Sequence, residues 1–302
     1  MKYILTFILS IFTYFALSQD KVVSYSYVTF DNAYQNSMRQ YVGYDKNFVI
    51  KNKDTTKEDH ILDVTPLVGW RCYFYNGMEN NFVDYRVNTN FKYNKNWCVN
   101  TNVSFLSSKE WSPVFFDGFV RRNKNRYSTE FFIERESVGT PIANQLRLVS
   151  TSAGLSTDFK ISRRLTIVNS LAYNNISDGN SRWFHVSRLI HTLNSTSYVD
   201  FKMRRMIGGD WSPYYFSPNQ IYQYNVGYGF NKSIKGVGAK FYFGTGLQRI
   251  DNYNMLMMNY DLRLNRTFNE KWYGELSTSS RNFNEYIYNT VNVRVIYTIG
   301  KE

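Results

Sequence analysis

Long hydrophobic runs are scarce in this chain of 302 residues. Apart from residues 4–17, no segment approaches the roughly 20 apolar residues that a membrane-spanning helix needs. The mean hydropathy is -0.44, which is low for any protein embedded in lipid through helices. Helices are therefore excluded as spanning elements. Strands are not excluded, because only every second residue of a barrel strand faces lipid.

Cysteine and histidine are rare as well, which leaves little material for disulfide or metal chemistry. Cys72 and Cys98 are too few for a disulfide scaffold and form no C-x-x-C pair, so we expect two free thiols. His185 and His191 share a face of a candidate strand, but six residues of strand separate them by about 20 Å, too far for one metal ion. We therefore predict no metal and no cofactor. The third histidine, His60, stands alone.

Residues 1–18 have the pattern of a secretory signal peptide. Lys2 supplies a positive start, residues 4–17 form an apolar run, and Ala16 and Ser18 are small residues before a cleavage point. A retained transmembrane helix is the alternative, but the run is short for that role. Residues 19–302 are then expected to form one domain, in which residues 19–60 are N-terminal strands or a short plug.

Strict alternation dominates the C-terminal third of the chain. Between residues 291 and 299, Val291, Val293 and Val295 share one face, and Asn292 and Arg294 share the other. Residues 222–230, 237–247 and 258–264 repeat this pattern, with Gly, Asn, Gln and Arg on the polar face. Period 2 indicates strands that separate two different environments. Aromatic residues make up 18% of the chain, as suits the girdles of a membrane barrel.

These patterns predict an all-β fold: a single transmembrane antiparallel up-and-down β-barrel of about 14–16 strands in the outer membrane of a Gram-negative bacterium. A soluble β-sandwich is the rival fold, although a wet lumen explains the polar faces better than a dry sandwich core does.

The net charge of +12 allows three interpretations. Basic side chains can line a lumen and favour anionic solutes, lie on extracellular loops beside the anionic headgroups of outer-membrane lipid, or bind nucleic acid. The secretory signal makes nucleic acid the weakest choice, and we expect none. Basic residues on candidate strands include Arg147, Arg188 and a group that alternates with apolar neighbours. The residues predicted to line the lumen are Lys202, Arg204, Lys240, Arg263, Arg294, Asn225, Asn259 and Asp261.

Two short segments carry a family resemblance. Residues 174–182 contain an Asp-Gly-Asn-Ser-Arg turn, and residues 214–222 read Tyr-Tyr-Phe-Ser-Pro-Asn-Gln-Ile-Tyr. With the strand hairpins that follow, residues 145–299 resemble the C-terminal barrel of bacterial exopolysaccharide export proteins of the cellulose type. Loops 177–182 and 208–220 are expected to shape one mouth of the barrel. The mouth-loop candidates are Asp178, Asn180, Arg182, Tyr215, Ser217 and Pro218.

The resemblance implies an export pore for a polysaccharide. Family members commonly carry a helical tetratricopeptide region before the barrel, whereas this chain has no 34-residue helical repeat. A separate periplasmic scaffold protein is therefore an expected partner.

We expect a passive channel or export pore for a polar solute, an anionic solute or a polysaccharide, and not an enzyme. A closed barrel that docks onto an envelope assembly is the alternative. An outer-membrane hydrolase or acyltransferase comes third, because Ser187 lies near His185 but no third catalytic group is evident.

Overall fold

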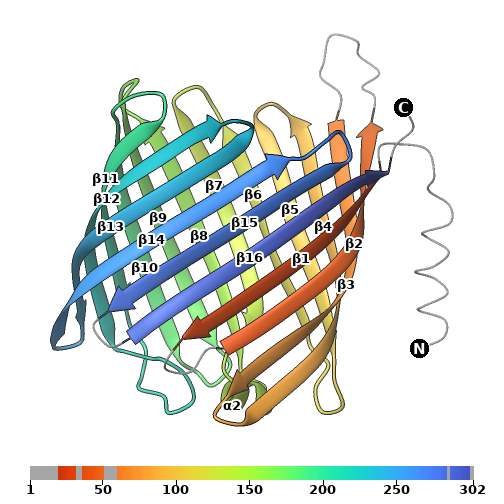
Figure 1. Cartoon of the computed structure of the whole chain (residues 1–302). Coiled ribbons are helices and arrows are strands. Elements are labelled where there is room, and N and C mark those ends of the chain that lie inside the picture. Colours follow the sequence, from red (N-terminus) through yellow and green to blue (C-terminus); the bar gives the residue numbers. More distant parts are fainter. Residues whose placement is uncertain (1–19, 32–35, 51–59, 284–285, 300–302) are drawn as a thin grey trace.

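The chain forms a closed barrel of 16 antiparallel strands in the computed structural model (Figure 1). The structure describes residues 20–31, 36–50, 60–283 and 286–299. Each strand pairs with its neighbours in sequence, and β1 pairs with β16 to close the ring. The predicted up-and-down barrel is confirmed, at the upper end of the expected strand number. The signal-peptide region, residues 1–18, lies outside the described residues.

The strands and the one short helix have the following bounds: β1 Asp20–Asp31, β2 Asn36–Ile50, β3 His60–Tyr75, β4 Met78–Asn94, β5 Trp97–Ser107, β6 Val114–Asn123, β7 Tyr127–Ser137, α2 Pro141–Gln145, β8 Val149–Lys160, β9 Leu165–Ile176, β10 Ser181–Thr192, β11 Ser197–Ile207, β12 Gln220–Ile234, β13 Val237–Ile250, β14 Tyr253–Thr267, β15 Trp272–Phe283 and β16 Tyr286–Ile299.

Ring closure depends on the N-terminal strands. The β1–β16 ladder opposes Tyr25 to Arg294 and Val28 to Val291, so the alternating C-terminal segment meets a partner with the same period. Residues 20–31 and 36–50 are therefore wall strands. Closure leaves no sheet edge, which is the condition that lets β-structure exist in a bilayer.

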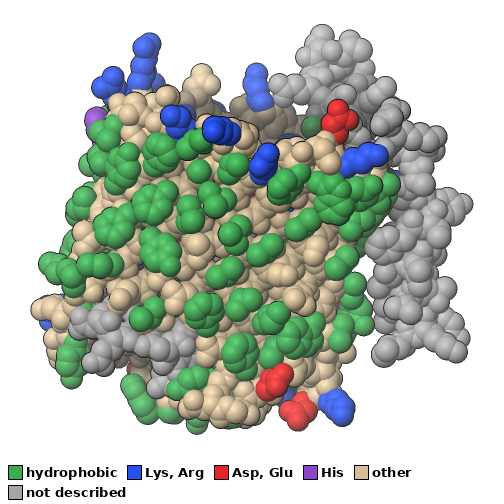
Figure 2. Space-filling model, in the orientation of Figure 1, with side chains coloured by type: hydrophobic (Ala, Val, Ile, Leu, Met, Phe, Trp, Pro, Cys, Tyr) green, Lys and Arg blue, Asp and Glu red, His purple; other side chains and the backbone are tan. Residues whose placement is uncertain are grey.

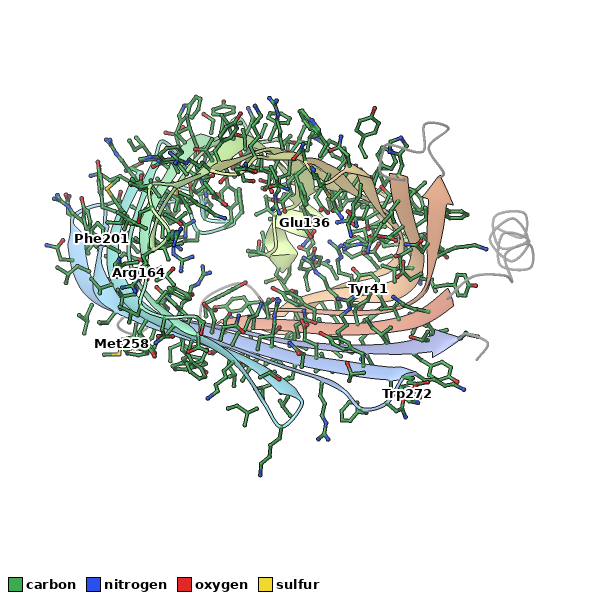
Figure 3. All side chains as sticks on the ribbon, turned by 90° about the horizontal axis from the view of Figure 1, so that it is seen from above. Tyr41, Glu136, Arg164, Phe201, Met258 and Trp272 are labelled. Carbon is green, nitrogen blue, oxygen red and sulfur yellow. The ribbon has the colours of Figure 1, made fainter. Side chains whose placement is uncertain are left out.

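Alternation places apolar side chains outside and polar ones inside. Val226, Leu155 and Phe201 are half exposed on the outer wall, where Figure 2 shows a broad belt of hydrophobic side chains. Large aromatics, including Trp97, Tyr127, Trp272, Trp183 and Tyr253, are exposed near the strand ends. In the view down the barrel, Phe201, Met258 and Trp272 lie on the outside of the ring (Figure 3). An apolar band with aromatic girdles is the surface that a lipid bilayer requires. Within the described residues, no helix is long and apolar enough to span a membrane.

The two mouths of the barrel differ in their connections. At one mouth the described turns are short, such as residues 95–96, 161–164 and 235–236. At the other mouth, residues 108–113, 138–148 and 208–219 form longer loops, and the second of these contains α2. We call these ends the short-turn mouth and the long-loop mouth. Both strand ends next to the chain termini lie at the short-turn mouth (Figure 1).

Candidate functional site: the lumen

A cavity of about 630 Å³ lies inside the barrel, along β10–β16. We call it the basic cavity. Among the described residues, its lining has a single acidic side chain, Asp261, whereas six are lysine or arginine. These six are Arg188, Lys202, Arg204, Lys240, Arg263 and Arg281. The lining is therefore electropositive, because many like charges around a confined space add their fields.

Asp200 organises one side of the basic cavity. Arg188 Nε donates to Asp200 Oδ2, and Tyr242 Oη donates to Asp200 Oδ1 over 3.0 Å. Tyr242 lies flat against the wall, since a Cβ on Gly227 would sit 2.1 Å from its hydroxyl. Gly227 is thus required by a close approach rather than by a turn. Both carboxylate oxygens of Asp200 are committed to these partners.

Amides continue the polar lining on the neighbouring strands. Tyr242 Oη also lies 3.0 Å from Asn225 Oδ1, and Asn225 Nδ2 donates to Asn259 Oδ1 over 2.8 Å. Arg263 Nε lies 3.5 Å from Glu275 Oε1 on the adjacent strand. Hydrogen bonds and an ion pair therefore link the polar side chains of this wall across neighbouring strands.

A dense charged network occupies the opposite wall of the lumen. Arg71 of β3 donates from Nη2 to Asp84 Oδ2 over 2.9 Å and from Nη1 to Glu136 Oε1 over 2.8 Å. Arg39 Nη2 lies 2.7 Å from the same Glu136 oxygen. Tyr41 Oη donates to Asp84 over 2.6 Å. These five residues are the Arg71 network, which links β2, β3 and β4 to β7; Tyr41 and Glu136 point into the lumen in Figure 3.

A second cavity of about 510 Å³ adjoins the Arg71 network; we call it the tyrosine cavity. Its lining includes Tyr25, Tyr27, Tyr41, Tyr73 and Tyr288. Strand β16 connects the two cavities, since Thr290 lines the basic cavity and Asn292 lines the tyrosine cavity. Tyrosine rings offer apolar faces with a polar edge, a combination that suits sugar rings.

Loops 177–180 and 208–219 are joined at the long-loop mouth. Asn180 Nδ2 donates to the carbonyl of Asp210 over 2.8 Å, and its Oδ1 accepts from the amide of Asp210 over 3.0 Å. The same Nδ2 lies 2.9 Å from Ser217 Oγ and 3.1 Å from Tyr215 Oη. We call residues 177–182 and 208–219 the mouth-loop cluster.

Tyr215 is the centre of the mouth-loop cluster. Its hydroxyl donates to Asp178 Oδ2 over 2.6 Å, and the Arg182 guanidinium lies 5.3 Å from its ring centre. Its ring packs in an apolar cluster with Val138 and Ala143 of the α2 loop. Burial, reinforced by the hydrogen bond to Asp178, raises the pKa of Tyr215.

The α2 loop is attached to this cluster. Thr140 caps α2 by accepting from the amide of Ala143, and its hydroxyl donates to the carbonyl of Tyr214 over 2.7 Å. Beyond the helix, Arg147 has a φ of 57° and donates to the carbonyl of Glu110 over 3.1 Å. Arg147 therefore lies in a loop, and its assignment to a strand was wrong because α2 interrupts the alternation there.

His185 and Ser187 face outward, not into the lumen. Ser187 Oγ lies 3.2 Å from His185 Nε2 and donates to Asn169 Oδ1 over 2.6 Å. No acidic side chain bonds to His185 within the described residues. His191 shares the outer face, by the parity of the β10 ladder.

The two cysteines, Cys72 and Cys98, are both free thiols.

The structure brings most predicted lumen residues together. Lys202, Arg204, Lys240, Arg263, Asn225, Asn259 and Asp261 all line the basic cavity. Arg294 lies apart from them, with its guanidinium 5.2 Å from the ring centre of Tyr25. The six mouth-loop candidates are also adjacent, because Gly209 approaches both Arg182 and the carbonyl of Pro218.

Sequence reasoning missed the Arg71 network and Arg281. Arg71 and Asp84 alternate with apolar residues such as Trp70 and Val83, so parity could have placed them inside. The pairing of Arg71 with Glu136, 65 residues away, has no local signal. Arg281 lies in a strand rich in serine and threonine, where apolar alternation is weak.

Comparisons with known proteins support the fold. No family model and no curated protein matches the chain. A solved structure described as a bacterial polysaccharide outer membrane secretin is similar, with a TM-score of 0.67 and 11% identity, over 93% of this chain and 99% of that one. OccK3 (OpdO) of Pseudomonas aeruginosa has a TM-score of 0.51 and 7% identity, over 93% of this chain and 95% of that one. The chain therefore has the fold of outer-membrane β-barrels.

Proposed function

We propose that the protein is an outer-membrane channel or export pore for polar solutes, including polysaccharide. One observation carries the proposal: a closed barrel, apolar outside, encloses polar cavities of about 630 and 510 Å³. Barrels of 8 strands are filled by side chains, whereas 16 to 18 strands leave an aqueous channel. The activity is passive, since the polar lining guides a solute without covalent chemistry.

A polysaccharide is favoured among the polar solutes. The tyrosine cavity and the amide-rich wall of the basic cavity suit the faces and hydroxyls of sugars. The similar structure described as a polysaccharide secretin agrees with this choice at the level of fold. The finer proposal is a cellulose-type export pore whose periplasmic scaffold is a separate protein.

We place the long-loop mouth outside the cell, because bacterial barrels have short periplasmic turns and longer extracellular loops. The short-turn mouth then faces the periplasm. Its turns carry exposed basic side chains, among them Lys124, Arg126, Arg163, Arg164 and Lys271. Figure 2 shows lysine and arginine side chains along this upper rim. This rim suits anionic lipid headgroups or an acidic surface of the scaffold partner.

Single-channel recording tests the proposed function. The purified protein is refolded, inserted into a planar bilayer and titrated with maltohexaose, a neutral sugar chain. We expect stable open steps that the sugar interrupts. A barrel that folds, as heat-modifiable gel migration and circular dichroism would show, but conducts no ions would overturn the channel.

A closed docking barrel is the second candidate. The Arg71 network and the α2 loop occupy part of the lumen near the long-loop mouth, which is the observation in its favour. Absence of conductance together with stable binding of a periplasmic partner would select this alternative.

A further inference from the structure

Four of the six cations that line the basic cavity make no hydrogen bond or ion pair with an acidic side chain among the described residues. One is Lys240, and the other three are Lys202 and Arg204 of β11 and Arg281 of β15. Arg281 interacts electrostatically with Lys202 and Arg204, although β11 and β15 are separated by three strands. We call these last three residues the cation triad.

The acids on the neighbouring positions are already bonded to other partners. Asp200 lies two residues from Lys202 on the same face of β11, but its two oxygens already accept from Arg188 and Tyr242. Glu275 is engaged by Arg263. Asp261 lines the same cavity, but no hydrogen bond or ion pair joins it to the triad among the described residues. The triad therefore presents three positive charges to the cavity without a directly bonded acid. Like charges held together in a confined space raise the free energy of the protein, and a bound anion lowers it.

We propose that the cation triad binds the acidic groups, carboxylate or sulfate, of an anionic sugar chain inside the lumen. This inference rests on the proposed channel and names its substrate class. Lys202 and Arg204 are about 7 Å apart along the strand, so they can bind more than one acidic group of an extended chain. Guanidinium groups bind carboxylates and sulfates through paired hydrogen bonds.

The surroundings of the triad favour a sugar chain over a small anion. The basic cavity is large, about 630 Å³, and its other lining groups include the amides of Gln223, Asn225 and Asn259. These amides can bond to hydroxyl groups. The tyrosine cavity adjoins it along β16 and offers ring faces for sugars further along the same path.

Current block by oligogalacturonate, a chain of uronic acid sugars, tests the triad in the full chain. Maltohexaose serves as the neutral chain and acetate as the small anion. We expect oligogalacturonate to block the open channel, and the K202Q/R204Q/R281Q triple variant to bind it about 10- to 100-fold more weakly, the effect of losing charge-assisted hydrogen bonds. Maltohexaose block should stay the same in both proteins.

Arg204→Gln and Arg205→Gln form the matched pair of variants. Both remove one positive charge from β11, but Arg205 faces outward, with its guanidinium 5.2 Å from the ring of Tyr222. Only the Arg204 variant should weaken oligogalacturonate binding. Equal binding by the triple variant would overturn the site. Acetate that competes with oligogalacturonate at equal carboxylate concentration would overturn the sugar-chain specificity.

A separate binding measurement keeps this proposal distinct from the channel. Isothermal titration of oligogalacturonate into the protein in detergent micelles needs no current. Triad-dependent binding without conductance would contradict the proposed channel and support the anion site. Conductance without triad-dependent binding would support the channel and contradict the anion site.

Discussion

Arg71 and Asp84 form an ion pair with Nη2 and Oδ2 2.9 Å apart, and their side chains are only 1% and 0% exposed. Such burial inside a water-containing barrel is unusual for charged groups, which are seldom fully buried unless paired. The pair is extended by Tyr41 on one side and Glu136 on the other. It ties the wall of β3 and β4 to β7, the strand that leads into the α2 loop.

Removal of one member of this pair should destabilise the barrel strongly. Arg71→Gln leaves Asp84 buried without its main counter-ion, and such losses cost about 3–5 kcal/mol. The free energy of unfolding in urea, measured in lipid vesicles, checks this. Arg121→Gln is the control, since it breaks the more exposed Arg121–Glu130 pair and should cost about 0–1 kcal/mol. Equal losses in the two variants would contradict the structural role of the Arg71 network.

Adjacent residues of β8 test the assignment of inside and outside. Leu155 is 49% exposed on the apolar wall, and Ser156 faces the lumen opposite Glu130. Leu155→Arg should lower the free energy of unfolding in vesicles by about 2–4 kcal/mol, the cost of arginine at the bilayer midplane. Ser156→Arg should be nearly neutral because its side chain faces the water of the lumen and not lipid. A larger loss of unfolding free energy for Ser156→Arg than for Leu155→Arg would contradict the assignment of the lipid-facing and lumen-facing sides of β8.

Asn180 should control the stability of the long-loop mouth. Asn180→Ala removes the bonds that join it to residues 210, 215 and 217, so we expect noisier open-channel current and faster proteolysis within residues 208–219. Asn194→Ala is the matched control, because Asn194 caps a turn at the short-turn mouth through the amides of Thr196 and Ser197. Loop cleavage at equal rates in both variants would argue against the mouth-loop cluster as a unit.

The raised pKa of Tyr215 predicts how the mouth responds to pH. An acid whose pKa is higher in the folded state stabilises that state below its unfolded pKa, about 10, and loses this effect as pH rises through the folded value. Current noise in the unmodified protein should therefore stay constant from neutral pH to about 10 and rise above it. Tyr215→Phe lacks the hydroxyl and should be noisy throughout, and a quiet variant would count against the hydrogen bond to Asp178.

Ser187 should have no catalytic role. Its proton goes to Asn169, and His185 lacks an acidic partner among the described residues, so the arrangement does not activate a nucleophile. Purified protein should leave fluorescent phospholipid and p-nitrophenyl esters intact, and Ser187→Ala should behave identically. Fatty-acid release that disappears in the variant would establish the hydrolase alternative instead.

The alternation of the strands was sufficient to predict the fold class and the direction of most lumen residues. Each residue of a strand has a face set by parity alone, and hydrophobic neighbours identify the lipid side. Lys202 and Arg204 could therefore be placed inward from Phe201 and Met203. Strands with weak alternation, such as β15, made the predicted number of strands less certain, because serine and threonine are compatible with both faces.

Contacts across the lumen could not be predicted in the same way. Arg71 meets Glu136 across 65 residues, and Arg281 faces Lys202 from a strand four positions away around the ring. Such distances depend on the number of strands, their tilt and the register at closure, none of which a single strand encodes. Ring closure therefore decides which cations pair with an acid and which remain unpaired.

The sequence by itself determined that this chain is a barrel with an apolar wall and a polar, basic interior, because period 2 acts locally on every strand. The tertiary structure alone decided that Asp200 is occupied by Arg188 and Tyr242, that Lys202, Arg204 and Arg281 are left without a counter-ion, and that Asn180 joins two loops at one mouth. The physical reason is that pairing of charges and amides depends on distance in space, which register and ring closure set.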